Sequence, residues 1–448
     1  MKDGNMFNRN DILRLSIPIM IDQISALLMG IIDSAMVSNC GEAVVSGVSI
    51  VDLLNYIIIV IFNAIASGGS VVVAQYIGKN DKENASKASM QTIISGTVVA
   101  FVLTLPCLFM TERMITMVYG AVEGEILKNA VSYFFFLSLS NPFFAIYLSC
   151  SGVFRANGNT KPIMVVSVLI NALNCVGNAI LIYGFGLGAA GAAISTSFCR
   201  LIGAALILFF LFKQSNIVNI HGKELFKIDF GMIKRVLNVA VPTGVETLLF
   251  QLGGLTARRF LVAIPNSVVE LAANAVANSL FNVTNIVGLT FSTAIMPVVG
   301  QCIGAERKPE AKKHTLDFVI GSSLINAALS VVMFFLLDYI IAVYGIGAEA
   351  TAIAKKMLSL NCLFVPLMWG AAAIFPGAFR AAGDNKFVMI VSMTLMWSIR
   401  VGLAYIFVTV LGYGAIGVWY AMYIEWVFKV VIYYLRYRSD VWLNKKVV

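Results

Sequence analysis

Long apolar runs alternate with short polar loops along the whole chain, and this pattern predicts membrane-spanning helices. Roughly 20 apolar residues in a helix are enough to cross the ~30 Å hydrocarbon core of a bilayer. The chain therefore predicts an all-α polytopic membrane protein with twelve transmembrane helices. The runs lie near residues 14–38, 46–77, 88–110, 129–150, 162–183, 188–212, 236–263, 271–303, 315–344, 354–378, 387–410 and 414–435.

The composition agrees with this pattern and excludes several classes of protein. Hydrophobic residues make up 59% and charged residues 12% of the chain, against about 45–50% and 25% in soluble domains. The net charge of +9 is no sign of a nucleic-acid partner, because the basic residues gather in loops on one side of the predicted membrane. The seven Cys form no CxxC motif, and we expect His221 and His314 in polar loops. We therefore expect no disulfide, no metal cluster and no cofactor other than a coupling ion.

The distribution of Lys and Arg predicts the orientation in the membrane. The loops on one side carry Arg113, Lys128, Lys355 and Lys356, whereas most of the 32 basic residues lie in the tails and loops of the other side. Basic residues are retained on the cytoplasmic side. We expect a multi-pass protein of the cytoplasmic (inner) membrane with both termini in the cytoplasm.

An internal repeat divides the chain into two halves of six spans. Motifs and prolines recur in the same order, 224 to 226 residues apart, and the pairs are Pro18 and Pro242, Gln75-Tyr-Ile-Gly78 and Gln301-Cys-Ile-Gly304, Pro142 and Pro366, and Arg155-Ala-Asn-Gly-Asn-Thr-Lys161 and Arg380-Ala-Ala-Gly-Asp-Asn-Lys386. Repeats with an even number of spans share one orientation and are related by an axis along the membrane normal. The repeat predicts two pseudo-symmetric lobes around a central cleft: residues 1–213 (helices 1–6), a cytoplasmic linker at 214–235, and residues 236–448 (helices 7–12).

Two carboxylates, Asp22 and Asp33, lie within the first apolar run. An aspartate at the centre of a membrane helix costs about 2.5–3.5 kcal/mol, so it is a candidate ion or substrate site by default. The two residues are eleven positions apart, which is close to three helical turns and about 16 Å on one face. Either can instead reach an interface, and for Asp22 the two alternatives are equally open. At the repeat offset Asp22 matches Glu246, whereas Asp33 matches Ala257, so the deep acid belongs to the N-terminal half alone.

Polar side chains of the fifth and sixth spans are expected at the depth of Asp33. Asn174 and Asn178 are four residues apart and share a helix face, and Thr196 lies in the outer half of the next span. A carboxylate with amide and hydroxyl oxygens suits Na⁺ or a bound proton and suits transition metals poorly. The alternative is that these side chains form ordinary hydrogen bonds between helices, worth about 0.6 kcal/mol each in membranes.

Further charged and aromatic residues within the spans are candidates for a central cleft. Arg200 and Arg400 each need an acid or backbone carbonyls as partners, and Glu425 and Lys429 can pair along one helix. Asp22, Glu246, Arg200 and Arg400 are the candidate cleft charges. The aromatic residues that could contact a flat cationic substrate, or could equally pack between helices or at the membrane interface, are Phe144, Tyr147, Trp369 and Trp397.

The chain resembles the multidrug and toxic-compound extrusion (MATE) transporters over essentially its whole length. The resemblance rests on the two six-span halves, the Arg-Ala-x-Gly-Asx-x-Lys loops, the run Gly188–Thr196, and Trp397-x-x-Arg400 followed by Gly402-Leu-Ala-Tyr405. It implies export of cationic or amphiphilic compounds in exchange for Na⁺ or H⁺, by alternation between outward-open and inward-open states. It also implies a monomer whose partners are small molecules and membrane lipids.

The resemblance assigns candidate cation-coupling residues. Asp33, fifteen residues after Pro18, corresponds to the family's first-helix acid, and Asn174, Asn178 and Thr196 match the remaining members of its N-lobe site by spacing. Asn178 replaces an aspartate that many members carry. Glu246 lies about one turn before the seventh-helix acid of the sodium-coupled branch, and the tenth span has no acid. The choice between Na⁺ and H⁺ therefore stays open.

Two other functions are compatible with parts of the sequence to different degrees. A flippase of the same superfold, moving a lipid or a lipid-linked oligosaccharide, has a strongly cationic cavity, so Arg200, Arg258, Arg259 and Arg400 keep that alternative open. An intramembrane enzyme is disfavoured, because the chain has no Ser–His pair, Asp–Asp motif or metal cluster of the required kind. We expect a transporter with no catalytic residues.

Overall fold

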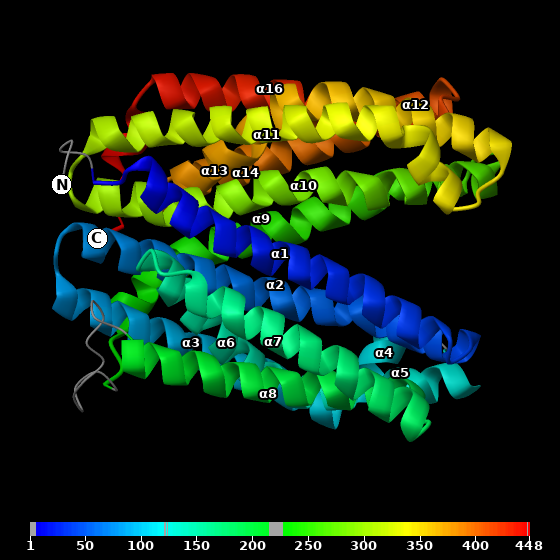
Figure 1. Ribbon diagram of the computed structural model, residues 1–448, viewed down its shortest axis with the longest axis horizontal. Coiled ribbons are helices and arrows are strands. Elements are labelled where there is room, and N and C mark those ends of the chain that lie inside the picture. Colours follow the sequence, from blue (N-terminus) through cyan, green and yellow to red (C-terminus); the bar gives the residue numbers. More distant parts are fainter. Residues whose placement is uncertain (1–5, 121, 123, 215–226, 446) are drawn as a thin grey trace. The chain divides into compact units, whose positions relative to one another are not determined.

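The computed structural model describes residues 6–120, 122, 124–214, 227–445 and 447–448. All regular secondary structure among these residues is helical, and within each part of the chain the helices run side by side (Figure 1). Eleven helices or helix pairs are long and apolar enough to span a membrane, and one further bent pair raises the number to twelve. The prediction of an all-α polytopic membrane protein is confirmed.

The chain packs into two compact units. The first comprises Asn8–Gly244 and Val448, and the second comprises Val245–Val447 together with the first seven residues. We call Asn8–Gly244 the N-lobe and Val245–Val447 the C-lobe. The helices of the N-lobe are α1 (Arg9–Ser38), α2 (Glu42–Gly78), α3 (Lys82–Phe109), α4 (Thr111–Tyr119), α5 (Gly124–Leu139), α6 (Asn141–Ala156), α7 (Lys161–Asn178) and α8 (Gly188–Gln214).

The boundary between the two units falls within one helix, α9 (Phe230–Val262). This helix begins inside the predicted linker at 214–235, and residues 215–226 lie outside the described residues, so the linker stays a prediction. The remaining helices are α10 (Ser267–Gly304), α11 (Lys308–Val343), α12 (Ala348–Phe364), α13 (Gly370–Ala382), α14 (Asn385–Thr394), α15 (Gly402–Tyr405) and α16 (Gly414–Arg438), and π-helical segments cover Ala179–Gly184, Val365–Trp369, Leu395–Val401 and Ile406–Val410.

The fourth span of each lobe is irregular where a proline interrupts its hydrogen-bond ladder. In the N-lobe, α5 and α6 meet at an angle of 48°, and Pro142 occupies the first turn of α6. In the C-lobe, the π-helical segment that contains Pro366 separates α12 from α13. Proline removes a backbone donor and its ring clashes with the preceding turn, so both irregularities follow from residues that the repeat places in register.

A glycine allows two helices to approach closely at the same place in each lobe. A Cβ on Gly152 of α6 would lie 2.5 Å from the backbone oxygen of Ala66 in α2, and a Cβ on Gly377 of α13 would lie 2.6 Å from that of Ser292 in α10. Small residues at such positions allow membrane helices to pack backbone to backbone. The two glycines are 225 residues apart in the sequence, so the close contact is part of the repeat.

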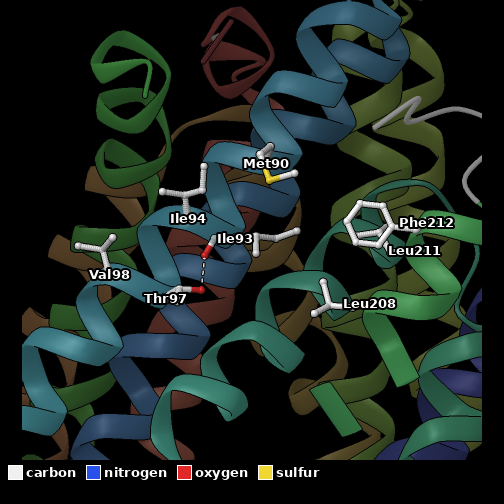
Figure 2. A pocket seen from close by; sticks show the side chains of 8 residues that line it. All are labelled: Met90, Ile93, Ile94, Thr97, Val98, Leu208, Leu211 and Phe212. Atoms are coloured by element: carbon white, nitrogen blue, oxygen red, sulfur yellow. Dashed lines mark hydrogen bonds between the residues drawn. The ribbon is translucent and has the colours of Figure 1, made fainter. Parts of the chain in front are cut away.

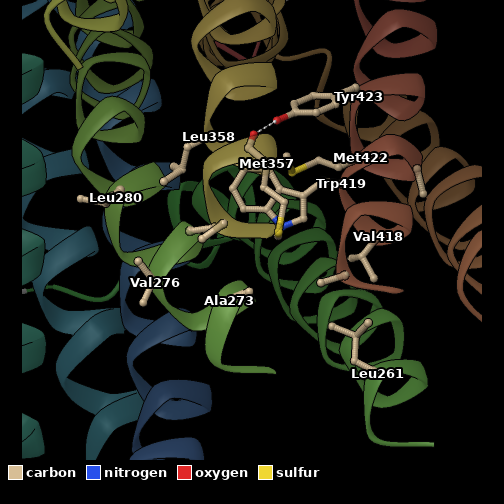
Figure 3. Packing of buried hydrophobic residues seen from close by; sticks show 14 of the residues in the cluster. Leu261, Ala273, Val276, Leu280, Met357, Leu358, Val418, Trp419, Met422 and Tyr423 are labelled. Atoms are coloured by element: carbon tan, nitrogen blue, oxygen red, sulfur yellow. Dashed lines mark hydrogen bonds between the residues drawn. The ribbon is translucent and has the colours of Figure 1, made fainter. Parts of the chain in front are cut away.

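The interior of the C-lobe is formed by one large cluster of apolar and aromatic side chains. Leu280 of α10, Met357 and Leu358 of α12, and Trp419 and Met422 of α16 meet there (Figure 3). The packing is close, and the Tyr423 hydroxyl within it lies 3.5 Å from the Met357 carbonyl oxygen. This core holds α16 in place and thereby positions the charged residues that follow Trp419 along it.

Changing Gly152 to alanine should destabilise the N-lobe by about 1–3 kcal/mol, because the added methyl group has no room against α2. The measurement is the apparent melting temperature of the purified protein in detergent. Gly30→Ala is the matched control, since nothing lies within 4 Å of a Cβ at Gly30. Equal melting temperatures for the two variants would contradict the close approach of α2 and α6.

Candidate cation and charge sites

The carboxylate of Asp33 lies among polar groups of three N-lobe helices. Its Oδ1 accepts a hydrogen bond of 2.5 Å from Asn178 Nδ2 of α7. With its amide oriented to satisfy its neighbours, Asn174 donates to the same oxygen at 3.2 Å and accepts from the Thr196 backbone N–H of α8 at 3.1 Å. Asn174 and Asn178 are buried, whereas Asp33 and Thr196 are half-buried. The structure therefore brings together the four residues that the sequence places at one depth.

The Asp33 cluster contains one buried oxygen atom that no hydrogen bond occupies. The Asn178 Oδ1 atom is buried and has no hydrogen-bond partner, although buried polar atoms are normally satisfied. Ser195 adds a hydroxyl, which the sequence reasoning had not named, at 3.1 Å from Asn174. These neutral oxygens beside one carboxylate form a set of hard ligands suited to Na⁺ or to a proton shared with water.

A second N-lobe carboxylate that the sequence reasoning missed acts on Asp33. Asp52 of α2 lies within electrostatic range of the Asp33 carboxylate, and it is itself exposed. It lies ten residues after the start of α2 at Glu42. The signal that could have revealed it is its place in an apolar run, which is unusual for an aspartate.

Asp22 is fixed by a different set of partners towards the other end of α1. Its carboxylate is hydrogen-bonded to Ser167 of α7 and lies in electrostatic range of Arg155 at the end of α6. Tyr147, a predicted substrate contact, is buried and bonds to the same serine. Asp22 thus lies within a carboxylate–arginine–serine–tyrosine group, of which Ser167 and Tyr147 are buried, and is not part of the Asp33 cluster.

The C-lobe contains a matching group around Glu246. Arg380 at the end of α13 donates to Glu246 Oε2 of α9 at 2.7 Å. Ser392 of α14 lies 2.9 Å from the Tyr433 hydroxyl of α16, and that tyrosine is in electrostatic range of both charges. At the repeat offsets Glu246, Arg380 and Ser392 match Asp22, Arg155 and Ser167. Each lobe therefore brings an acid of its first helix near an arginine at the end of its fourth span, as an ion pair in the C-lobe and within electrostatic range in the N-lobe.

The two arginines predicted to need partners find different ones. Arg400 lies 3.6 Å from Glu425 Oε2 of α16, as expected. Arg200 of α8 instead donates to the Ser140 hydroxyl at 3.1 Å and the Asn141 Oδ1 at 3.3 Å. The expectation of an acid or backbone carbonyls is thus wrong for Arg200, because the bend between α5 and α6 presents side-chain oxygens to its guanidinium.

The four aromatic candidates for substrate contact differ in accessibility. Phe144 supports the Arg200 guanidinium at 4.3 Å and stacks on Tyr147. Trp369 packs against Trp426 with ring centroids 5.0 Å apart, whereas Trp397 is 40% exposed. Their role in substrate binding stays a prediction.

One group of potential metal ligands occurs away from these sites among the described residues. Ligand atoms of Cys302, Glu310 and His314 lie within 4.8 Å of one another. His314 was expected in a polar loop, but it lies within α11 and is 4% exposed. The helix begins at Lys308, so the polar stretch around His314 forms its first turns. His221 lies outside the described residues. Glu310 is already bonded to Arg307 at 2.9 Å, which limits its use as a ligand.

A well-formed hollow on the N-lobe is a poor candidate for an ion or substrate site. It has a volume of about 330 Å³ and lies between Met90–Val98 of α3 and Leu208–Phe212 of α8 (Figure 2). Thr97 is the polar residue of its lining, and its hydroxyl is bonded to the Ile93 carbonyl oxygen at 2.7 Å. Such a lining offers no charge or free donor to a ligand and is typical of a surface in contact with acyl chains.

The fold and the buried polar sites define a class: a polytopic membrane protein with two repeated lobes and carboxylates held inside them, as in secondary transporters. Comparison of the chain with models of known protein families identifies one family. The MatE family model matches residues 18–180 and again residues 242–406. The chain belongs to this family of transporters, and the two matches, which begin at Pro18 and Pro242, confirm the internal repeat.

Relatives and solved structures agree with this assignment. The chain is 26% identical to the uncharacterized transporter YisQ of Bacillus subtilis, covering 96% of this chain and 94% of the relative. It is 23% identical to a probable multidrug resistance protein NorM of Thermotoga maritima, covering 98% and 94%. An outward-facing multidrug resistance MATE transporter has the same fold, with a TM-score of 0.90, 21% identity, and coverage of 96% and 95%. A MOP superfamily transporter from Pyrococcus furiosus, described as having a binding pocket of reverse polarity, has a TM-score of 0.89, 22% identity and coverage of 96% and 95%.

Removing one partner of the Glu246–Arg380 pair should cost about 3–5 kcal/mol, because the remaining charge is left uncompensated in the lobe interior. We expect Arg380→Met to lower the melting temperature markedly. The double variant E246Q/R380M should recover much of the loss. Lys87→Met, which breaks an exposed pair with Glu83, should change stability by less than about 1 kcal/mol. A single R380M variant as stable as K87M would show that the pair does not anchor α9.

Proposed function

We propose that this chain exports cationic or amphiphilic compounds across the cytoplasmic membrane in exchange for Na⁺ or H⁺. The observation that carries the proposal is the Asp33 carboxylate held by Asn174 and Asn178 beside Thr196. A charge within a membrane span is energetically costly, so a charged residue retained there usually has a function. The names of the relatives, which include probable multidrug resistance proteins, support export of small toxic molecules.

In this proposal Asp33 binds the coupling cation directly. Na⁺ would take oxygens from Asp33, Asn178 and Thr196, and its positive charge would remove the repulsion between the carboxylate and Asp52. A proton would neutralise Asp33 in the same way. Asp52 thus supplies the second negative charge that many family members obtain from an aspartate in place of Asn178.

Cation binding drives transport through a difference in affinity between two states of the protein. A ligand shifts a conformational equilibrium only by its differential affinity for the two states. The hydrogen bonds from the amides of α7 to the carboxylate of α1 are a contact that would differ between the two states. With the cation bound, Asn178 no longer needs to donate to a bare carboxylate, so α1 and α7 can adopt another arrangement. This arrangement would have lower affinity for the exported compound.

A flippase for a lipid or lipid-linked oligosaccharide is the second candidate function. Arg200 supports it, because this buried cation is bonded to neutral oxygens of Ser140 and Asn141 and keeps its full positive charge for an anionic head group. The reverse-polarity pocket described for the Pyrococcus furiosus transporter shows that this fold accommodates other charge patterns. The repeated acid in each lobe and the Asp33 cluster favour exchange with a cation.

Replacing Asp33 by Asn should abolish gradient-driven efflux while leaving insertion and folding intact, because the amide is isosteric but carries no charge. The measurement is ethidium efflux from cells that express equal amounts of protein. Asp338→Asn, at an exposed acid paired with Lys355, is the matched control and should retain full efflux. Ethidium efflux retained by D33N would refute the role of Asp33.

The coupling ion is identified by imposing Na⁺ and pH gradients separately on proteoliposomes. We expect one inward cation gradient alone to drive efflux, and D33N to abolish the response to it. Accumulation of substrate without either gradient would contradict exchange. Transport of a lipid-linked sugar in the absence of drug export would favour the flippase.

A further inference from the structure

A group of buried charges in the C-lobe has more cations than anions. Lys429 Nζ lies 3.0 Å from Glu425 Oε1, and Arg400 Nη1 lies 3.6 Å from Glu425 Oε2. Glu425 is fully buried, whereas the Lys429 and Arg400 side chains are 10% and 16% exposed. One carboxylate is therefore shared by two basic side chains from different spans.

The neighbouring charges do not restore the balance. Glu246 lies one helical turn before Phe250 on α9, but Arg380 already neutralises it at 2.7 Å. The group then has three positive and two negative charges, from Arg380, Arg400, Lys429, Glu246 and Glu425. Arg258 is also in electrostatic range of Arg400 and adds to the positive potential. Among the described residues that form this group, one positive charge remains without a matching acid.

An unmatched cation at this depth has a strong tendency to bind an anion. Arg400 lies near the middle of the span Asn385–Val410, and Lys429 near the middle of α16, so both cations are far from the ends of their helices. Buried ions of one sign are costly unless they are paired. The cost can be met by an anionic ligand that is present only when the protein is loaded.

The shape of the group suits an aromatic acid. Both cations lie over the same ring, with Arg400 Cζ 5.5 Å and Lys429 Nζ 4.9 Å from the centroid of Phe250. Phe250 and Arg400 remain partly exposed, so the group is not sealed by the lobe. The ring offers an apolar surface beside two donors, and the planar guanidinium can bind a carboxylate or phosphate through two parallel hydrogen bonds.

We propose that Arg400, Lys429 and Phe250 form an anion subsite that binds the carboxylate, sulfonate or phosphate group of an amphiphilic aromatic substrate. The subsite rests on the proposed export function and narrows its substrate class, from cationic compounds to compounds that also carry an acidic group. Glu425 is a positioning residue: it holds the two cations together and lowers their affinity for a second anion.

Binding of two dyes that differ in one group tests the subsite. Rhodamine 6G is an ethyl ester, and rhodamine 19 is its free acid with the same ring system. We expect purified protein in phosphatidylcholine nanodiscs to bind the acid about tenfold more tightly than the ester, the equivalent of one charge-assisted hydrogen bond. Fluorescence polarisation measures both affinities at equilibrium without any gradient.

Three variants separate a ligand role from a structural one. Arg400→Gln leaves a neutral Glu425–Lys429 pair and should abolish the preference for the acid without changing ester binding. Glu425→Gln removes the competing carboxylate and should increase the affinity for the acid, which is the opposite of the effect expected for Arg400→Gln. Arg259→Gln changes the net charge equally but lies outside the group, and it should leave the preference unchanged. Melting temperatures verify that each variant is folded.

The outcomes distinguish the subsite from the export function. Equal affinity of the wild-type protein for acid and ester, or a preference that survives R400Q, overturns the subsite. Loss of the preference in nanodiscs that contain phosphatidylglycerol also overturns it, because a lipid head group then occupies the position. Acid-selective binding with no efflux of either dye under Na⁺ or pH gradients supports the subsite and refutes the export function instead.

Discussion

Charged side chains within the spans are held by polar or charged partners of the same lobe, and the rest of the structure depends on this constraint. Hydrocarbon offers no partner to a carboxylate or guanidinium, so protein groups must supply one. Asp33 takes amide donors from α7, Glu246 takes the guanidinium of Arg380, and Glu425 takes two cations. The contacts of Asp33 and Glu246 join helices that are distant in the sequence, and the contact between Arg400 and Glu425 joins two consecutive spans.

The repeat gives the two lobes the same backbone arrangement, and the lobes differ in their charged residues. The close approaches at Gly152 and Gly377, and the placement of Asp22 and Glu246 near an arginine, recur in both lobes. The Asp33 cluster has no counterpart, since the matching position is Ala257. The N-lobe thus holds a carboxylate among neutral oxygens, whereas the group around Glu425 in the C-lobe has more cations than anions.

This difference has a consequence for the chemistry of transport. A cluster with a single negative charge attracts a small cation, whereas a group with a positive excess beside an aromatic ring attracts an organic anion. Binding energy released at either place can shift the protein between states only if the contacts differ between them. The π-helical segments in the fifth, tenth and eleventh spans are irregular backbone of the kind often found at such functional positions.

The sequence alone determined the number and order of the spans, the two-fold repeat and the family, because these follow from apolar length and from motifs at one offset. It also placed Asp33, Asn174, Asn178 and Thr196 at one depth, since depth along a helix is a local property. The partners of Arg200 and Asp22, the burial of His314 and the proximity of Asp52 were decided by tertiary structure. Those contacts depend on how helices rotate and bend against one another, and the short-range pattern of a single span carries no information about its neighbours' faces.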